Sequence, residues 1–181
     1  MSDQTPQIGK FNWKSFYETI NKGPDIALAL VGAAVLDEML KRLLEQYFIE
    51  SAITKESFER GKTLHTFESK IRLAYQLGLI QKLEYQALNN VAEIRNTFAH
   101  SFEEMDFERK EIHDLIDELP AWGMEKIIRK NTELDRRLKF RIFLAQASSI
   151  LALRPPFFQK RLRFSAYLEK RKEAKRKGAR E

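Results

Sequence analysis

Hydrophobic residues recur along most of this chain at the three- and four-residue intervals of an α-helix. No strong run alternates polar with apolar residues, as a half-buried strand would. Glycine and proline, which interrupt helices, account for only 7 and 5 of the 181 residues. The pattern therefore predicts an all-α fold, a single bundle of about five to six helices.

The longest predicted helix follows Gly23-Pro24-Asp25, where glycine and proline make the turn and the Asp25 carboxylate caps the helix. The helix should run to about Ile49. Its inward positions are Leu28, Val31, Val35, Leu36, Met39, Leu43 and Phe48. The small residues of Gly32-Ala33-Ala34 predict a smooth face on which a neighbouring helix packs closely.

Caps and stops predict the remaining helices. Thr66 caps a helix that Gly78 ends, after a loop over residues 51–65. The later helices are expected over residues 82–99, from Asp106 to Leu119, and from the capping box Thr132-Glu133-Leu134-Asp135 to Leu153, before Pro155-Pro156. The bundle is expected to comprise residues 1–158, and residues 159–181 a basic C-terminal helix or tail.

Charge is concentrated at the C-terminus. The chain has a net charge of +6, but residues 159–181 hold ten Lys/Arg and three Asp/Glu, a net charge of +7. Residues 1–158 are therefore close to neutral. Such tails contact nucleic acid or acidic surfaces weakly and without sequence preference. The candidate contact residues are Lys170, Arg171, Lys172, Lys175, Arg176 and Lys177.

Several classes of protein are excluded or disfavoured. Cysteine is absent, which excludes disulfides and thiolate chemistry, and the three histidines do not form a metal-binding motif. Phosphate-binding loops and a nucleophile elbow are also missing, so we expect no cofactor and no metal. The longest apolar run, Ile26 to Leu36, is too short to cross a bilayer, and no secretory signal is recognisable. We expect a soluble, cytoplasmic protein.

The most informative motif is Arg95-Asn96-Thr97-Phe98-Ala99-His100, at the end of a predicted helix. Arginine can donate two parallel hydrogen bonds to a phosphate or carboxylate, and histidine exchanges a proton near neutral pH. On a helix, however, Arg95 and His100 would point about 140° apart. They could act on one phosphate only if the last turn distorts or a second copy completes the site. Arg60 and His65 repeat the spacing in a predicted loop, so spacing alone proves nothing.

Three blocks of sequence, residues 32–40, 67–80 and 94–100, together resemble the mannitol repressor family. The resemblance covers roughly residues 26–119. It implies an all-helical regulator of mannitol utilisation that lacks an obvious helix-turn-helix and acts through protein contacts.

The motif around Arg95 also resembles that of the HEPN superfamily, in which Arg and His form a metal-independent ribonuclease site across a dimer. In that reading His100 is the general acid or base on a ribose hydroxyl, Arg95 neutralises phosphate charge and Asn96 orients the pair. In the structural reading, Arg95 and His100 tie helices or a dimer together through hydrogen bonds.

We favour a negative transcriptional regulator that is a homodimer and binds a regulatory protein partner. A HEPN-type ribonuclease is the alternative, so whether the protein is an enzyme is left open at this point.

Overall fold

The computed structural model describes residues 12–101, 105–122 and 135–154. Its helices are α1 (Trp13–Lys22), α2 (Asp25–Tyr47), α3 (Ala52–Ser57), α4 (Phe67–Gln76), α5 (Lys82–His100), α6 (Lys110–Asp117) and α8 (Arg136–Leu153). The described part of the chain contains no strand, which confirms the all-α prediction.

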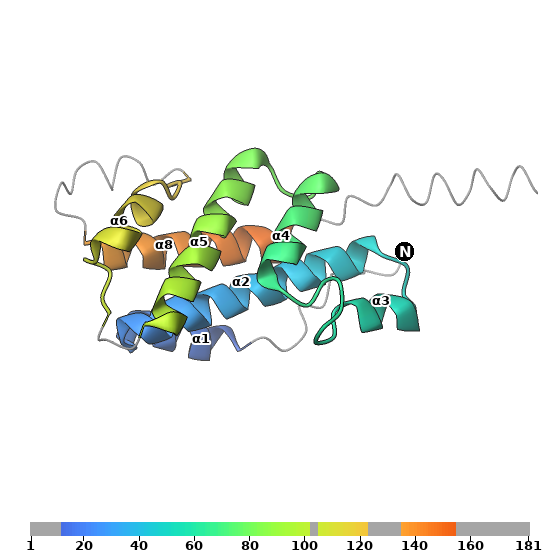
Figure 1. Ribbon diagram of the computed structural model, residues 1–181, viewed down its shortest axis with the longest axis horizontal. Helices are drawn as coiled ribbons and strands as arrows, with labels where there is room; N and C mark the ends of the chain where they lie inside the picture. The colour runs from blue at the N-terminus through green and yellow to red at the C-terminus, as the bar shows by residue number, and fades with distance from the viewer. Residues whose placement is uncertain (1–11, 102–104, 123–134, 155–181) are drawn as a thin grey trace, which may run out of the picture.

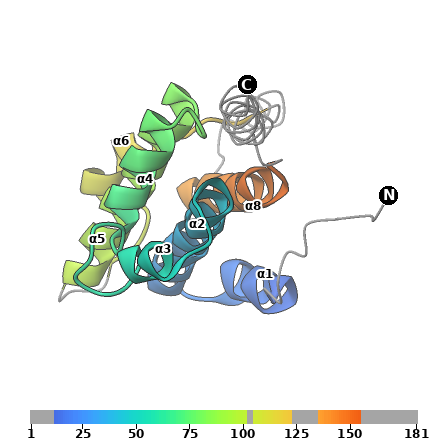
Figure 2. The same ribbon diagram turned by 90° about the vertical axis from the view of Figure 1, so that its right-hand side faces the viewer.

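Helix α2 is the centre of the bundle. It contacts α1, α4, α5 and α8, and α6 lies against both α5 and α8. Figure 1 shows α2 and α8 running side by side along the molecule, with α4 and α5 laid across α2. In the end-on view, α1 lies on the far side of α2 from α4 and α5 (Figure 2). The central place of α2 agrees with its ten buried residues.

One hydrophobic core joins these helices. Its largest fully buried side chains include four phenylalanines, Phe98, Phe107, Phe140 and Phe143. Phe107 lies between Phe98 and Phe140, with ring centroids 5.1 Å away on each side and the rings tilted relative to one another. This row of rings joins the end of α5 to α8 through the segment that precedes α6.

Gly32 of α2 packs directly against the Leu144 side chain of α8. A Cβ atom at this position would lie 2.3 Å from Cδ1 of Leu144, well inside van der Waals contact. The prediction that the Gly32-Ala33-Ala34 face admits a neighbouring helix is therefore confirmed, and that helix is α8.

Two short helices were not predicted. Helix α1 precedes the first predicted element, and α3 lies inside the segment that we expected to be a loop. Helix α3 has no buried residue, so hydrophobic periodicity gives no sign of it; its signal is Ser51, whose hydroxyl accepts a hydrogen bond from the Thr54 N–H. The described part of the bundle thus has seven helices rather than five to six.

Two predicted caps are wrong, because both carboxylates have partners other than the N–H groups of the helix start. Asp25 is the first residue of α2, and its side chain accepts from the Phe107 N–H and pairs with Arg137. Asp106 accepts from the Glu108 N–H in the turn before α6, which begins only at Lys110. The predicted cap at Thr66 is confirmed. Asp135, predicted as the acidic third helical residue of a capping box, is instead itself the N-cap of α8. Thr132 lies outside the described residues.

None of the helices in the described ranges is long and apolar enough to cross a membrane. The basic residues after position 159 lie outside the described residues, as does the expected boundary between bundle and tail at residues 158 and 159.

Candidate functional site

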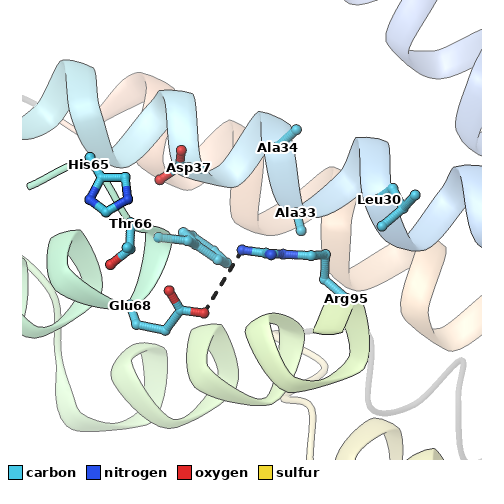
Figure 3. Close-up of a pocket in the computed structure, with 9 residues that line it drawn as sticks. Leu30, Ala33, Ala34, Asp37, His65, Thr66, Glu68 and Arg95 are labelled. Carbon is cyan, nitrogen blue, oxygen red and sulfur yellow. Dashed lines mark ion pairs between the residues drawn. The ribbon is translucent and has the colours of Figure 1, made fainter. Parts of the chain in front are cut away.

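A groove opens between the middle of α2, the start of α4 and the last third of α5 (Figure 3). Its volume is about 490 Å³. The lining residues are Leu30, Ala33, Ala34, Asp37, His65, Thr66, Phe67, Glu68 and Arg95. The small side chains of Ala33 and Ala34 line the bottom of the groove and leave the space that Arg95 enters. Gly32, the preceding residue, instead packs against Leu144 of α8.

Arg95 reaches across the groove from α5. Its Nη2 lies 3.9 Å from Oε1 of Glu68, and the two side chains are 34% and 41% exposed. Figure 3 shows the guanidinium extended toward the centre of the groove, with the Glu68 carboxylate beside it. A half-exposed pair at this distance contributes at most about 1 kcal/mol to stability, so Arg95 retains donors for another acceptor.

Asn96 joins the same cluster. Its Nδ2 donates to Oε1 of Glu68 at 3.5 Å, the outer limit of a hydrogen bond. Arg95 and Asn96 thus both contact the Glu68 carboxylate of the neighbouring helix. Glu68 lies in the first turn of α4, where the helix dipole stabilises a negative charge.

The opposite wall of the groove rests on a buried lysine. Lys70 is 3% exposed. Its Nζ donates to Oδ1 of Asp37 at 2.7 Å and to the His65 carbonyl at 3.2 Å. Because an unpaired buried ammonium would cost several kcal/mol, these contacts fix the start of α4 against α2. Thr66 completes the wall by accepting from the Ser69 N–H.

His100 is not part of this groove. It is exposed in the last turn of α5 and is absent from the residues that line the space around Arg95. The helix continues regularly through His100, so the last turn is not distorted and the predicted 140° offset from Arg95 stands. Within one protomer, the structure brings Arg95 and Asn96 together but does not bring His100 to them.

The histidine that faces Arg95 across the groove is His65, which we had set aside as part of a repeated spacing in a loop. Sequence reasoning also missed Asp37 and Glu68. The one available signal was that both lie in blocks of the family resemblance, residues 32–40 and 67–80.

The groove carries charges of both signs. It presents one guanidinium, one imidazole and two carboxylates, each carboxylate already paired with a cation. No group of acidic residues and histidines that could hold a metal occurs among the described residues. Open, mixed-charge surfaces of this kind select partners by electrostatic complementarity.

Comparisons with solved structures place this all-α fold in a known class. In the X-ray structure of the MtlR-HPr complex from Escherichia coli, one chain matches with a TM-score of 0.61 and 19% identity, covering 77% of this chain and 98% of that chain. The crystal structure of YggD from Shigella flexneri 2a str. 2457T, described as a possible transcriptional regulator, matches with a TM-score of 0.61 and 12% identity, covering 82% and 99%.

The family model of the mannitol repressor matches residues 13–146. The chain belongs to the mannitol repressor family, as the three blocks of sequence predicted. No curated protein matches it. These comparisons support a regulatory role and give no support to a ribonuclease.

Proposed function

We propose that this protein is a negative transcriptional regulator that acts by binding a protein partner, and that the Arg95 groove is part of the contact surface. The observation that carries the proposal is the state of Arg95. Its guanidinium stands in an open groove, with its Nη2 3.9 Å from the Glu68 carboxylate. Arginines in such surroundings are frequent anchors of protein interfaces, because one side chain offers five donors and a large packing surface.

The similar MtlR chain was solved in complex with HPr, and from this we take HPr as the partner. A protein partner fits the groove better than a small substrate does. The groove is shallow enough that Arg95, Glu68 and His65 keep substantial exposure, whereas small-molecule sites bury most of their ligand.

The basic tail and a second copy of the chain complete the proposal. We propose that the tail residues from Lys170 to Lys177 give weak nucleic-acid binding that salt abolishes. We further propose that the protein is a homodimer, which light scattering at working concentration would test.

The experiment is a calorimetric titration of the purified full-length protein with HPr from the same organism. We expect a saturable complex with a dissociation constant in the micromolar range, typical of transient regulatory contacts. An absence of heat and of co-elution at concentrations of about 100 μM would reject HPr as the partner. The same titration with a mixture of transcripts in place of HPr should give only salt-sensitive binding.

A further inference from the structure

A second groove lies on another part of the surface, between α5 and α6, and neither the proposed partner contact nor the family explains it. It has a volume of about 460 Å³ and is lined by Leu83, Tyr85, Gln86, Asn90 and Glu118 among others. Large hydrophobic side chains are exposed at one end of this groove. Leu83 is 49% exposed, and Tyr75, whose ring lies 4.7 Å from that of Tyr85, is 40% exposed.

The other end of this groove is acidic. Residues 106–118 contain six Asp/Glu and two Lys/Arg. Two of the acids, Glu108 and Asp117, pair with Arg136 of α8. The remaining acids of α6 and its C-cap, Glu111, Asp114 and Glu118, are all exposed and fall within about 60° of one another around the helix axis.

This acidic stripe borders the groove directly. Glu118 lines it, and Nδ2 of Asn90 on α5 donates to Oε2 of Glu118 at 3.1 Å and to the Leu115 carbonyl at 3.2 Å. No ion pair involves Glu111 or Asp114 within the ranges that the structure describes. The surface therefore combines exposed aromatic and aliphatic side chains with unneutralised carboxylates.

The described chain ends beside this groove. Arg154, the last described residue, pairs with Glu84 in the first turn of α5 and donates to the Leu79 carbonyl. Glu84 is the neighbour of Leu83 and Tyr85 in sequence. The 27 residues that follow Arg154 are thus joined to the body next to the first turn of α5, the turn that also carries Leu83 and Tyr85. Even as a helix, at about 1.5 Å per residue, they would reach well past the acidic end of the groove.

The sequence of that segment complements the groove in the same order. Aromatic and aliphatic residues come first, with Phe157, Phe158, Leu162 and Phe164, and the basic run from Lys170 to Lys177 follows. We propose that the groove between α5 and α6 is the docking surface of this protein's own C-terminal segment. The apolar residues cover Tyr75, Leu83 and Tyr85, and the basic run lies along Glu111, Asp114 and Glu118.

Docking within one chain is favoured over docking onto a second copy because the tether is short. A segment joined to the chain next to the groove has an effective concentration in the millimolar range, far above that of a separate molecule in dilute solution. Within a dimer the second copy is also close, and the mixed-mass cross-links below separate that arrangement from docking within one chain. As a consequence, the carboxylates of α6 partly neutralise the positive charge of the tail. The full chain should therefore bind nucleic acid less tightly than the free tail would.

The test is zero-length carbodiimide cross-linking of the full-length protein at about 1 μM, read by mass spectrometry of the monomeric band. We expect cross-links from Lys170, Lys172, Lys175 or Lys177 to the carboxylates of α6, and their loss at about 0.5 M salt, where charges are screened beyond a few ångströms. The variant Glu111→Gln/Asp114→Asn/Glu118→Gln should also bind a single-stranded oligonucleotide about fivefold or more tightly than the parent.

The matched control changes three exposed acids elsewhere on the surface, as Glu18→Gln/Glu50→Gln/Glu59→Gln. Its net charge equals that of the groove variant, and we expect its oligonucleotide affinity to rise by less than about twofold. Cross-links spread evenly over all exposed carboxylates, or equal effects of the two triple variants, would overturn the proposal. A mixture of isotopically light and heavy protein, in which the copies have exchanged before cross-linking, decides the geometry when it is read in the dimeric as well as the monomeric band. Mixed-mass cross-links as frequent as same-mass ones would replace the intramolecular contact with a contact between copies.

Discussion

Arg154 at the end of α8 forms an ion pair with Glu84 in the first turn of α5, and the two side chains are only 16% and 13% exposed. Arg154 also donates to the Leu79 carbonyl, and Glu84 accepts from the Gln81 N–H in the capping box of α5. At the opposite end of α8, Arg137 pairs with Asp25 and donates to the Gly23 carbonyl. Both ends of α8 are thus fixed to turns between other helices.

Replacing Arg154 with Ala should therefore destabilise the fold by about 2 kcal/mol, because it leaves Glu84 buried with one partner fewer. Urea unfolding followed by circular dichroism measures this. The control is Lys41→Ala, which breaks an exposed pair with Glu45 at 3.9 Å and should cost less than about 0.5 kcal/mol. Equal losses of unfolding free energy in the two variants would show that the Arg154–Glu84 ion pair adds no stability beyond that of an exposed pair.

Replacing Gly32 with Ala tests the contact between α2 and α8. In an exposed helix this change usually stabilises by about 0.5–1 kcal/mol. Here the added methyl group meets Leu144, so we expect a net loss of about 1–2 kcal/mol. Leu144→Val should recover part of that loss when combined with Gly32→Ala, although alone it destabilises. A gain in melting temperature for Gly32→Ala would contradict the packing described.

Lys70→Met removes the buried ammonium but keeps most of the side-chain volume. We expect a destabilisation of about 1–3 kcal/mol, since the Asp37 carboxylate and the His65 carbonyl lose their shared donor. Lys55→Met, at an exposed position of α3, is the control and should change stability by less than about 0.5 kcal/mol. If Lys70→Met unfolds at the same urea concentration as the parent, the ion pair does not hold the groove wall.

His100→Gln separates the regulator from a ribonuclease, because glutamine retains hydrogen bonding but cannot transfer a proton at neutral pH. We expect the purified protein to leave RNA intact in excess chelator, with or without this change. We also expect the melting temperature to be unchanged, since His100 is exposed. Cleavage that disappears in His100→Gln while the melting curve stays the same would establish the ribonuclease instead.

The sequence predicts the larger helices α2, α4, α5 and α8 well, because hydrophobic spacing, capping residues and glycine or proline stops together indicate them. It does not predict α3, which buries nothing. The errors at Asp25 and Asp106 have different causes. The Asp25 carboxylate binds distant groups instead of capping α2, whereas Asp106 accepts a local hydrogen bond in a turn that ends before α6 begins. The Asp25 partners, Phe107 and Arg137, are more than 80 residues away in sequence.

The residues of the candidate site were also predicted only in part from the sequence. The motif identifies Arg95, since helix periodicity places it along the apolar stripe of α5. Asn96 shares a helix face with His100, so its contact with Glu68 did not follow from periodicity. Glu68 and His65 could not be paired with them from the sequence, because the pairing depends on how α4 packs across α2 and α5. The rotation per residue of a helix was enough to predict that His100 faces elsewhere.

The most direct test of the regulatory account compares Arg95→Ala with Lys14→Ala in a calorimetric titration with HPr. Lys14 is an exposed cation on α1, which does not line the groove, so both variants lose one positive charge. We expect Arg95→Ala to weaken the proposed complex by at least about tenfold while both proteins remain folded, as for an arginine at the centre of an interface. Unchanged affinity in Arg95→Ala, or an equal loss in Lys14→Ala, would contradict the account.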